Sequence, residues 1–336
     1  MSDSTTRPRG HRAVITPSAP IAAADRPTPG PIAVGPESAE HIERAVTLGG
    51  GTLGPIDDDT RGLVWLSTRD PEGLDRVLHE HPGIEWVQLP MAGVDAFAEV
   101  LARHADRPKP LWTSAKGAFS EPVAEHALAL TLGLLRVFPE RLRATSWAKE
   151  QRGISLYGLD VVIVGAGGIA LEIMRLLEPF DASVTIVRRS TEPVAGAART
   201  VAAAALDEVL PTADVVVVAA AMTSGTARMF GAEQFAAMKP TAVLVNIARG
   251  GLVDTDALVE ALDAGAIWGA GVDVTDPEPL PDGHPLFSSD RAIVTPHQAD
   301  TPEMVAPLLA ERIRHNVRAL LGDGEFIGVV DPAEGY

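Results

Sequence analysis

The chain has 336 residues, of which 46% are hydrophobic, enough for about two globular domains with full cores. Its net charge of −17 argues against nucleic acid or an anionic membrane as a partner, because both are bound through clustered Lys and Arg. It contains no cysteine, which excludes disulfides and thiol chemistry and fits a reducing compartment. No apolar run approaches the roughly 18 residues that cross a membrane, so we expect a soluble, cytoplasmic protein.

Residues 1–30 contain five prolines and no periodic apolar pattern, which predicts a disordered tail. From residue 31 short apolar runs alternate with helical stretches, a pattern typical of a parallel α/β unit. The expected elements of this first unit are strands at 32–34, 63–67 and 84–89 and helices at 39–48 and 71–79.

A long, buried helix is expected from about residue 120 into the arginine-rich stretch at 141–143, and it contains His126, which we expect to be packed or hydrogen-bonded. A second α/β unit then begins at Leu159. Its expected strands are 161–164, 184–187, 215–218, 242–245, 269–272 and 292–294.

The last helix is expected to begin at Asp300 or Thr301, with Glu303 completing a capping box, and to run to Leu321. Such a helix follows the second unit and can return to the first one. The expected domains are therefore a substrate domain of residues 31–119 plus 299–336 and a nucleotide-binding domain of residues 120–298.

The second unit opens on a glycine-rich turn, residues 165–170, which lies between a β-branched strand and an apolar helical run. This order is typical of a dinucleotide-binding fold. Gly165 permits the turn, Gly167 lets the pyrophosphate approach the backbone, and small Ala170 lets the helix pack on the strand, while the helix N-terminus faces the phosphates. The expected contacts with the cofactor phosphates are Gly165, Gly167, Gly168 and Ile169.

Two other motifs carry no site. A second G-x-G-x-x-G, at residues 49–54, follows a helix and runs into Pro55, so we interpret it as a helix end and a loop. His79 and His81 look like a metal pair, but residues two apart on a helix do not converge. No metal is expected.

Three ionisable residues occupy loops near the C-terminal end: Arg249 before two glycines, Glu278 between two prolines, and His297 after a proline. A guanidinium can grip a substrate carboxylate in a fork and polarise the neighbouring keto oxygen. An imidazolium can give that oxygen a proton as a hydride arrives, and a carboxylate can hold the imidazole in the correct tautomer. The three residues together predict a site of hydride transfer to a 2-keto acid.

From about residue 31 to the end, these motifs and their order resemble the D-isomer-specific 2-hydroxyacid dehydrogenase family. The resemblance implies an α/β fold with two Rossmann-like lobes. One is a cofactor domain with a doubly wound parallel sheet, and the other is a discontinuous, flavodoxin-like substrate domain. The resemblance implies a site in the cleft of this two-lobed fold, and family members are usually homodimers. It implies Arg249 as substrate binder, His297 as acid/base and Glu278 as its partner.

The resemblance implies further contacts. Backbone amides of Ala92 and Gly93 would hold the substrate carboxylate, and Asp273 would contact the nicotinamide amide. Thr223 and Ala248 would also contact the cofactor, although the family often has proline where this chain has Ala221-Met222 before Thr223.

The most useful departure from the family lies at the end of the second strand of the nucleotide fold. Members that use NAD carry an acidic residue there, which accepts hydrogen bonds from the ribose hydroxyls. This chain has Arg188, followed by Arg189 and Ser190. Two guanidiniums and a hydroxyl would bind a 2′-phosphate that an acid would repel, so NADP(H) is favoured and NAD(H) stays open.

We therefore expect an NAD(P)H-dependent reductase of the glyoxylate/hydroxypyruvate type, which makes the D-2-hydroxy acid from a small 2-keto acid. One alternative is D-3-phosphoglycerate dehydrogenase of the same family, against which we note that few residues follow His297, too few for the regulatory domain of many such enzymes. A second alternative is a non-catalytic, nucleotide-sensing protein, since a transcriptional corepressor shares this fold.

Overall fold

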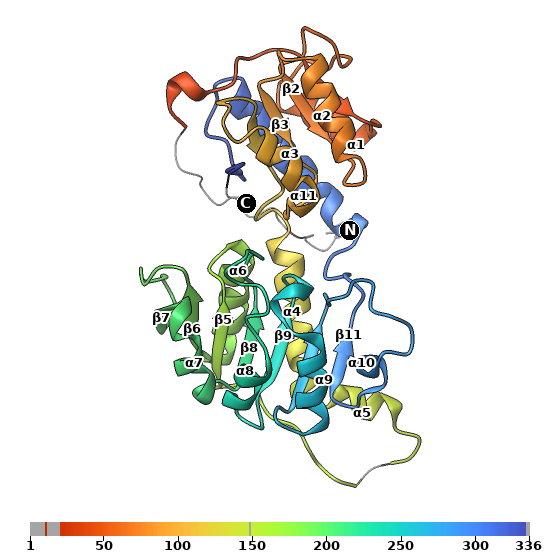
Figure 1. The fold of residues 1–336 in the computed structure, drawn as a ribbon, viewed down its shortest axis with the longest axis vertical. Coiled ribbons are helices and arrows are strands. Elements are labelled where there is room, and N and C mark those ends of the chain that lie inside the picture. Colours follow the sequence, from red (N-terminus) through yellow and green to blue (C-terminus); the bar gives the residue numbers. More distant parts are fainter. Residues whose placement is uncertain (1–10, 12–20, 148, 334–336) are drawn as a thin grey trace, which may run out of the picture. The chain divides into compact units, whose positions relative to one another are not determined.

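The structure is a computed structural model that describes residue 11 and residues 21–147 and 149–333. The chain forms two compact units (Figure 1). The first comprises Met1–Glu121 with Thr301–Tyr336, and the second Pro122–Asp300. The sequence-based boundaries, after residues 119 and 298, differ from these by two residues.

The first unit is built on a four-stranded parallel sheet in the order β1-β2-β3-β4. A parallel bridge between Ile32 and Leu53 adds the glycine-rich segment after the first helix to the free edge of β1. With this segment counted, the strand order is that of a flavodoxin-like sheet, 2-1-3-4-5. The strands are β1 (Ile32–Gly35), β2 (Gly62–Trp65), β3 (Trp86–Gln88) and β4 (Leu111–Thr113).

The helices of the first unit bury one apolar face each, and the core between α1 and α11 includes Ile42 and Val46 of α1 with Ile313 and Val317 of α11. The helix α1 ends at Leu48, directly before residues 49–54, as the sequence predicts. The helices are α1 (Glu40–Leu48), α2 (Pro71–Glu80), α3 (Ala98–Arg103) and α11 (Pro302–Leu320), with short 3-10 turns η1 (Ala23–Asp25) and η2 (Asp95–Phe97).

The capping box expected at α11 is wrong. The hydroxyl of Thr301 accepts a hydrogen bond from the amide of Met304 at 3.4 Å, and the helix begins at Pro302. A capping box requires Glu or Gln at the third helical position. That position is Met304, and Glu303 lies at the second.

Of the expected tail, residues 1–10 and 12–20 lie outside the described residues, and disorder there stays a prediction. Residues 21–30 instead contact the first unit: Arg26 donates to Glu325 at 2.9 Å and to the carbonyl of Gly324 at 2.6 Å, and the amide of Thr28 donates to Glu85 at 2.7 Å. Ile21 also packs against the core between α1 and α11. Residues 21–30 therefore belong to the folded unit, although most of the contacts named here are polar and leave no apolar pattern in the sequence.

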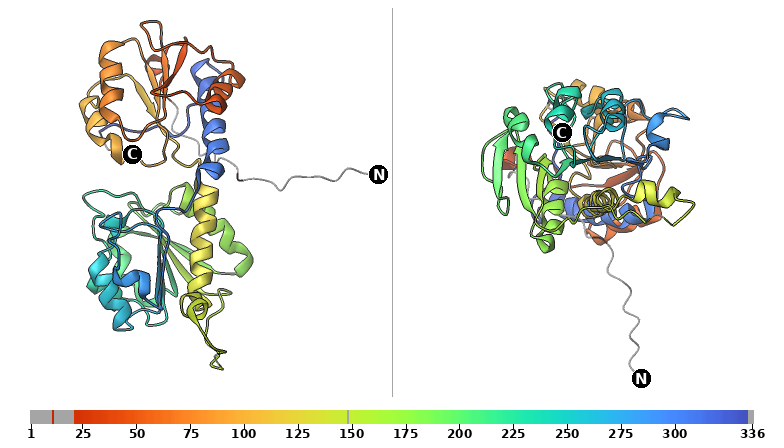
Figure 2. Two further views of the ribbon diagram at one scale, coloured as in Figure 1. Left: turned by 90° about the vertical axis from the view of Figure 1, so that its right-hand side faces the viewer. Right: turned by 90° about the horizontal axis from the view of Figure 1, so that it is seen from below.

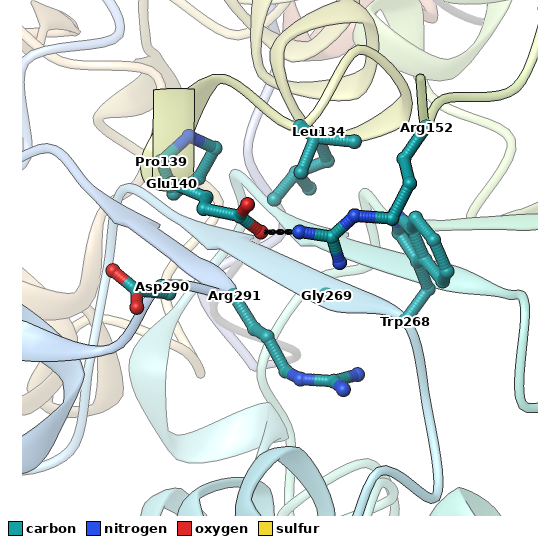
Figure 3. Close-up of a pocket in the computed structure, with 9 residues that line it drawn as sticks. Leu134, Pro139, Glu140, Arg152, Trp268, Gly269, Asp290 and Arg291 are labelled. Carbon is teal, nitrogen blue, oxygen red and sulfur yellow. Dashed lines mark hydrogen bonds and ion pairs between the residues drawn. The ribbon is translucent and has the colours of Figure 1, made fainter. Parts of the chain in front are cut away.

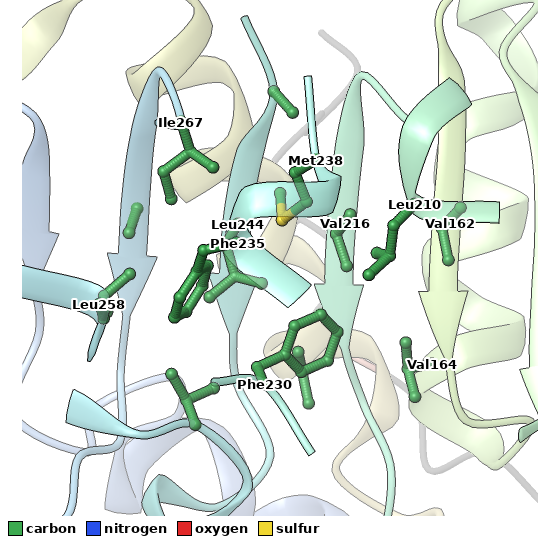
Figure 4. Close-up of a cluster of buried hydrophobic side chains, with 14 of the residues drawn as sticks. Val162, Val164, Leu210, Val216, Phe230, Phe235, Met238, Leu244, Leu258 and Ile267 are labelled. Atoms are coloured by element: carbon green, nitrogen blue, oxygen red, sulfur yellow. The ribbon is translucent and has the colours of Figure 1, made fainter. Parts of the chain in front are cut away.

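The second unit is built on a seven-stranded parallel sheet in the order β11-β10-β9-β8-β5-β6-β7. This is the doubly wound order 3-2-1-4-5-6 with one further strand. Its central strands are buried on both faces and are therefore almost continuously apolar, and Figure 4 shows part of the core. The strands are β5 (Asp160–Val164), β6 (Ser183–Arg188), β7 (Arg199–Ala202), β8 (Val215–Val218), β9 (Val243–Asn246), β10 (Gly269–Val272) and β11 (Ala292–Val294).

Helices cover both faces of this sheet. The yellow helix α4 lies on one face and the cyan helices α8 and α9 on the other (Figure 2). At Gly271 of β10 a Cβ would lie only 3.0 Å from the Cβ of Leu130, so glycine lets α4 pack closely on the strand. The helices are α4 (Ser120–Leu135), α5 (Phe138–Arg143), α6 (Gly168–Leu177), α7 (Leu206–Val209), α8 (Ala232–Ala237), α9 (Thr255–Asp263) and α10 (Pro285–Ser288), with 3-10 turns η3 (Glu178–Phe180), η4 (Ala203–Ala205), η5 (Leu210–Thr212) and η6 (Gly250–Leu252).

The single helix expected from residue 120 to residues 141–143 is wrong, because Val137 adopts a left-handed conformation with φ of 58° and separates α4 from α5. The strands β4 and β7 were also not expected. None of the helices in the described part of the chain has the length and apolar character needed to span a lipid bilayer.

Candidate active site

The expected cofactor and catalytic residues of the second unit follow the ends of its strands. Because all seven strands are parallel, their carboxyl ends share one edge of the sheet, and ligands of such folds bind where the strand order reverses. That reversal occurs at β5, which lies between β6 and β8. Gly165 follows β5, Arg188 ends β6, Arg249 follows β9, Asp273 follows β10 and His297 follows β11.

The glycine turn has the backbone that a pyrophosphate needs. Gly165 has φ of +122°, and a Cβ there would overlap the carbonyl oxygen of Ala219, so no other residue fits. Gly167 caps α6, and a Cβ there would meet no atom within 4 Å. Gly168 and Ile169 begin the helix behind this open space. The turn therefore fits the phosphates of a dinucleotide.

At the end of β6, Arg188 is half-buried and Arg189 is exposed. The hydroxyl oxygen of Ser190 is buried and has no hydrogen-bond partner among the described residues. A buried hydroxyl usually finds a partner, and a phosphate on the cofactor ribose would supply one. This set fits a 2′-phosphate.

The pairing of Glu278 with His297 is confirmed: Glu278 Oε1 lies 2.6 Å from His297 Nδ1. The two side chains are 43% and 52% exposed, respectively. Since Nδ1 is engaged by the carboxylate, Nε2 is the nitrogen that can exchange a proton with a substrate.

The backbone of His297 is held by Asp273. His297 has φ of +51°, a strained value for a residue with a side chain, and its amide donates to the Asp273 carbonyl at 2.7 Å. The Asp273 side chain, 1% exposed, accepts hydrogen bonds from the Thr295 hydroxyl at 2.6 Å and from the amides of Gln298 at 2.9 Å and Ala299 at 3.1 Å. The expected contact of Asp273 with a nicotinamide amide stays a prediction.

A second histidine supports the same loop. His126 Nε2 lies 2.9 Å from the Thr295 hydroxyl, which gives its own proton to Asp273, so His126 is the donor. The sequence predicted a packed or hydrogen-bonded His126, and this is confirmed. The roles of Thr295 and His126 in holding the His297 loop were missed, and the only sequence signal for Thr295 is its place directly before Pro296 and His297.

The Arg249 turn is fixed by Asn246, a residue for which the sequence suggested no role. The Asn246 side chain accepts from the amide of Ala248 at 3.1 Å and donates to the carbonyl of Arg249 at 3.0 Å. Arg249 is half-buried, and its Nη1 donates to the Ala248 carbonyl at 2.7 Å. At Gly250 a Cβ would overlap the backbone of Thr275, so this turn packs directly on the loop that leads to Glu278.

The Thr223 loop follows β8 and packs on the Arg249 turn. Thr223 is exposed, and its amide donates to the Thr226 hydroxyl at 2.8 Å. A Cβ at Gly251 would lie 2.6 Å from the Met222 methyl group. The loop lies at the carboxyl edge of the sheet, but contact of Thr223 or Ala248 with a cofactor stays a prediction.

In the first unit, the expected carboxylate loop of Ala92 and Gly93 follows β3. The carbonyl of Met91 accepts a hydrogen bond from the amide of Ala115 at 3.0 Å. The amides of Ala92 and Gly93 have no hydrogen-bond acceptor among the described residues. Two adjacent amides of this kind fit an anionic group such as a carboxylate.

One further carboxyl group lies near His297. Burial raises the pKa of Asp300 above its usual range; the His297 ring acts against this shift, and the Asp273 carboxylate adds to it.

A cavity of about 240 Å³ lies on the other edge of the second unit, at the amino ends of β10 and β11 (Figure 3). Trp268 and Arg291 line it, and an ion pair joins Glu140 to Arg152 at its rim. It contains no residue of the candidate site.

Comparison with known proteins defines the class. Residues 127–299 match the family model of the D-isomer specific 2-hydroxyacid dehydrogenase, NAD binding domain. The chain is 36% identical over 297 residues to an uncharacterized protein from the proB 3′ region of Corynebacterium melassecola, an alignment that covers 87% of this chain and 95% of that protein.

Relatives with named activities match over shorter segments. The chain is 34% identical to the glyoxylate reductase of Pyrococcus furiosus, over 62% of this chain and 65% of that protein. It is also 34% identical to the D-3-phosphoglycerate dehydrogenase of Mycobacterium bovis, over 61% of this chain but only 39% of that protein.

Among solved structures, a D-isomer specific 2-hydroxyacid dehydrogenase from Xanthobacter autotrophicus Py2, in complex with NADPH and MES, is similar with a TM-score of 0.77 and 25% identity. The match covers 92% of this chain and all of that chain. The protein thus belongs to the D-isomer-specific 2-hydroxyacid dehydrogenase family of NAD(P)-dependent oxidoreductases.

Proposed function

We propose that this protein reduces a small 2-keto acid of the glyoxylate or hydroxypyruvate type to the D-2-hydroxy acid, with NADPH as the favoured reductant. The observation that carries the proposal is the Glu278–His297 pair at 2.6 Å, on the same sheet edge as Arg249 and the glycine turn. Family membership and the resemblance to a glyoxylate reductase support it.

The proposed roles of the cofactor residues follow from their chemistry. The backbone at Gly165, Gly167, Gly168 and Ile169 would bind the pyrophosphate, and Arg188, Arg189 and Ser190 would bind the 2′-phosphate. When bound, the reduced nicotinamide supplies the hydride that reaches the carbonyl carbon. Because the guanidiniums stand where an acidic residue would contact ribose hydroxyls, they favour NADPH over NADH.

The substrate is held by its carboxylate. The Arg249 guanidinium forms two parallel hydrogen bonds to it and polarises the keto oxygen, and the amides of Ala92 and Gly93 provide further donors. Fixing both groups of the substrate orients the carbonyl carbon and so lowers the entropic part of the barrier.

His297 supplies the proton. As negative charge develops on the keto oxygen, Nε2–H of the imidazolium gives that oxygen its proton and completes the hydroxyl group. The Glu278 carboxylate keeps the proton on Nδ1 and stabilises the charged ring before transfer. Since the ring is half exposed, it regains a proton from water after the step.

We also propose a homodimer, formed through the second unit. Phe138, Leu142 and Phe287 are exposed there, Leu142 to 81%, and they line one surface hollow together. An exposed apolar patch of this kind is typical of a subunit interface. Light scattering should give the mass of a dimer for the wild type and of a monomer for Leu142→Glu; a monomeric wild type at micromolar concentration would contradict the proposal.

A substrate panel tests the proposed activity. Glyoxylate, hydroxypyruvate, pyruvate and 3-phosphohydroxypyruvate are assayed with NADPH and with NADH, and His297→Ala serves as the inactive control. We expect the highest kcat/KM for glyoxylate or hydroxypyruvate with NADPH. A clear preference for 3-phosphohydroxypyruvate would favour phosphoglycerate dehydrogenase instead, and NADPH binding without any turnover would favour a nucleotide sensor.

A further inference from the structure

The helix α11 carries two polar side chains on its buried face, Arg312 and Asn316, which are 1% and 0% exposed. Residues four apart on a helix share one face, so both point into the first unit. Buried arginine is rare because removing a charge from water is costly. Here burial lowers the pKa of Arg312 to about 10, which leaves the guanidinium charged at neutral pH.

The Arg312 guanidinium binds the loop that follows β4. Its Nη1 donates to the carbonyl of Ser114 at 3.0 Å and its Nη2 to the carbonyl of Lys116 at 2.8 Å. Two donors in one plane therefore fix two carbonyls, and the amide of the residue between them, Ala115, donates to Met91 at 3.0 Å. Arg312 thus supports, through this loop, the backbone directly before Ala92 and Gly93.

Asn316 supports the same region from one turn further along α11. Its side-chain amide donates to Gln88 Oε1 at 2.9 Å, at the end of β3. The amide of the next residue, Leu89, donates to the carbonyl of Thr113 at 2.7 Å. The end of β3 is therefore hydrogen-bonded to α11 through Gln88, and the segment that follows it is hydrogen-bonded to the end of β4.

The C-terminal segment is shaped to admit the guanidinium. Gly328 has φ of +70°, and a Cβ there would overlap both Arg312 Nη1 and the carbonyl oxygen of Ser114. Its carbonyl accepts the amide of Ser114 at 2.8 Å. Any side chain at this position would displace the guanidinium from the loop.

We propose that Arg312 is a positioning residue for the loop that presents the amides of Ala92 and Gly93 to a substrate carboxylate. The inference rests on the proposed function for the identity of that ligand. Leu89 and Val94 are buried at the two ends of this loop, whereas Met91 between them is 41% exposed, so the backbone from Met91 to Gly93 depends on the contacts that Arg312 supports.

The test uses two variants and one control. Arg312→Lys keeps the charge but loses the planar pair of donors, and Arg312→Met removes both. Arg318→Met is the control, since Arg318 is exposed on the same helix. We expect the KM for glyoxylate to rise about tenfold or more in both Arg312 variants, as the loss of a hydrogen bond to a charged donor implies, with the KM for NADPH within twofold of the wild type. The control should match the wild type.

Hydrogen exchange measured by mass spectrometry separates this inference from the proposed function. In the Arg312 variants, amides of peptides covering residues 89–95 and 113–118 should exchange faster, while those of residues 165–170 stay unchanged. If Arg312→Met unfolds globally, the exchange and KM of Arg312→Lys test the inference. If the wild type reduces no 2-keto acid, the proposed function fails and exchange alone decides the inference. Unchanged exchange in the two loops of a folded variant overturns it, as does an unchanged glyoxylate KM in an active one.

Discussion

Replacing Asp273 by asparagine should lower turnover without weakening cofactor binding. The Asp273 carboxylate accepts three hydrogen bonds from residues 295–299 and is almost fully buried. Asparagine has nearly the same shape but only one acceptor oxygen. At least one of the three donors would then face an NH2 group, and the strained backbone of His297 would lose part of its support.

The size of the effect follows from these contacts. Leaving one buried donor unsatisfied costs about 1 to 3 kcal/mol. If the loop moves His297 out of its productive position and the whole cost appears in the barrier, kcat falls about 5- to 150-fold, since about 1.4 kcal/mol corresponds to a factor of ten. The loss should appear in kcat, because the three hydrogen bonds of this carboxylate go to the loop that carries His297.

Steady-state kinetics with glyoxylate and NADPH measure the effect, with Asp282→Asn, an exposed position in the adjoining segment, as the matched control. The account predicts a reduced kcat and an NADPH KM within twofold of the wild type. A raised NADPH KM with an unchanged kcat would instead indicate the nicotinamide contact expected from the family. Kinetics equal to the wild type in both respects would refute the reasoning.

Four further predictions concern separate parts of the molecule. Arg188→Asp removes a charge-assisted contact worth about 1.5 to 3 kcal/mol, so its preference should move toward NADH; a wild type with a lower KM for NADH than for NADPH would contradict this. Arg249→Lys keeps the charge but loses the fork and should lose most of kcat/KM, whereas near-normal kinetics would mean that the carboxylate is held elsewhere. Because burial raises the pKa of Asp300, the folded protein binds that proton more tightly than the unfolded chain and loses stability as pH rises from about 4 through the raised pKa. The Tm of Asp300→Asn relative to the wild type should therefore increase from pH 4 to pH 7, and a constant difference would exclude this effect. Deleting residues 2–30 should lower Tm, because it removes the hydrogen bonds of Arg26 to Glu325 and of Thr28 to Glu85; an unchanged Tm in thermal denaturation would contradict this.

Much of the second unit can be predicted from its sequence because its central strands are buried on both faces. The runs 161–164 and 215–218 are continuous β-branched or apolar stretches for this reason. The strand β7 is an edge strand with a single buried residue, and β4 has only three residues, so neither has a comparable apolar run. The break at Val137 was not predictable, since a β-branched residue rarely adopts positive φ.

The residues of the site also fall into a predictable and an unpredictable group. Arg249, Glu278 and His297 carry their signal in the chemistry of the side chains and in the glycines and prolines beside them. The residues that hold those loops do not, because their contacts join distant segments: His126 and Thr295 are 169 positions apart. Only the folded chain shows that the His297 loop is supported from α4, or that Arg312 supports the loop after β4.

Product analysis tests the central claim most directly. The wild-type protein is incubated with hydroxypyruvate and NADPH, and the NADP⁺ formed and the two enantiomers of glycerate are quantified by chiral chromatography. The account predicts one molecule of D-glycerate for each NADPH oxidised. Formation of L-glycerate, or binding of NADPH with no oxidation of it in the presence of any 2-keto acid, would contradict the account.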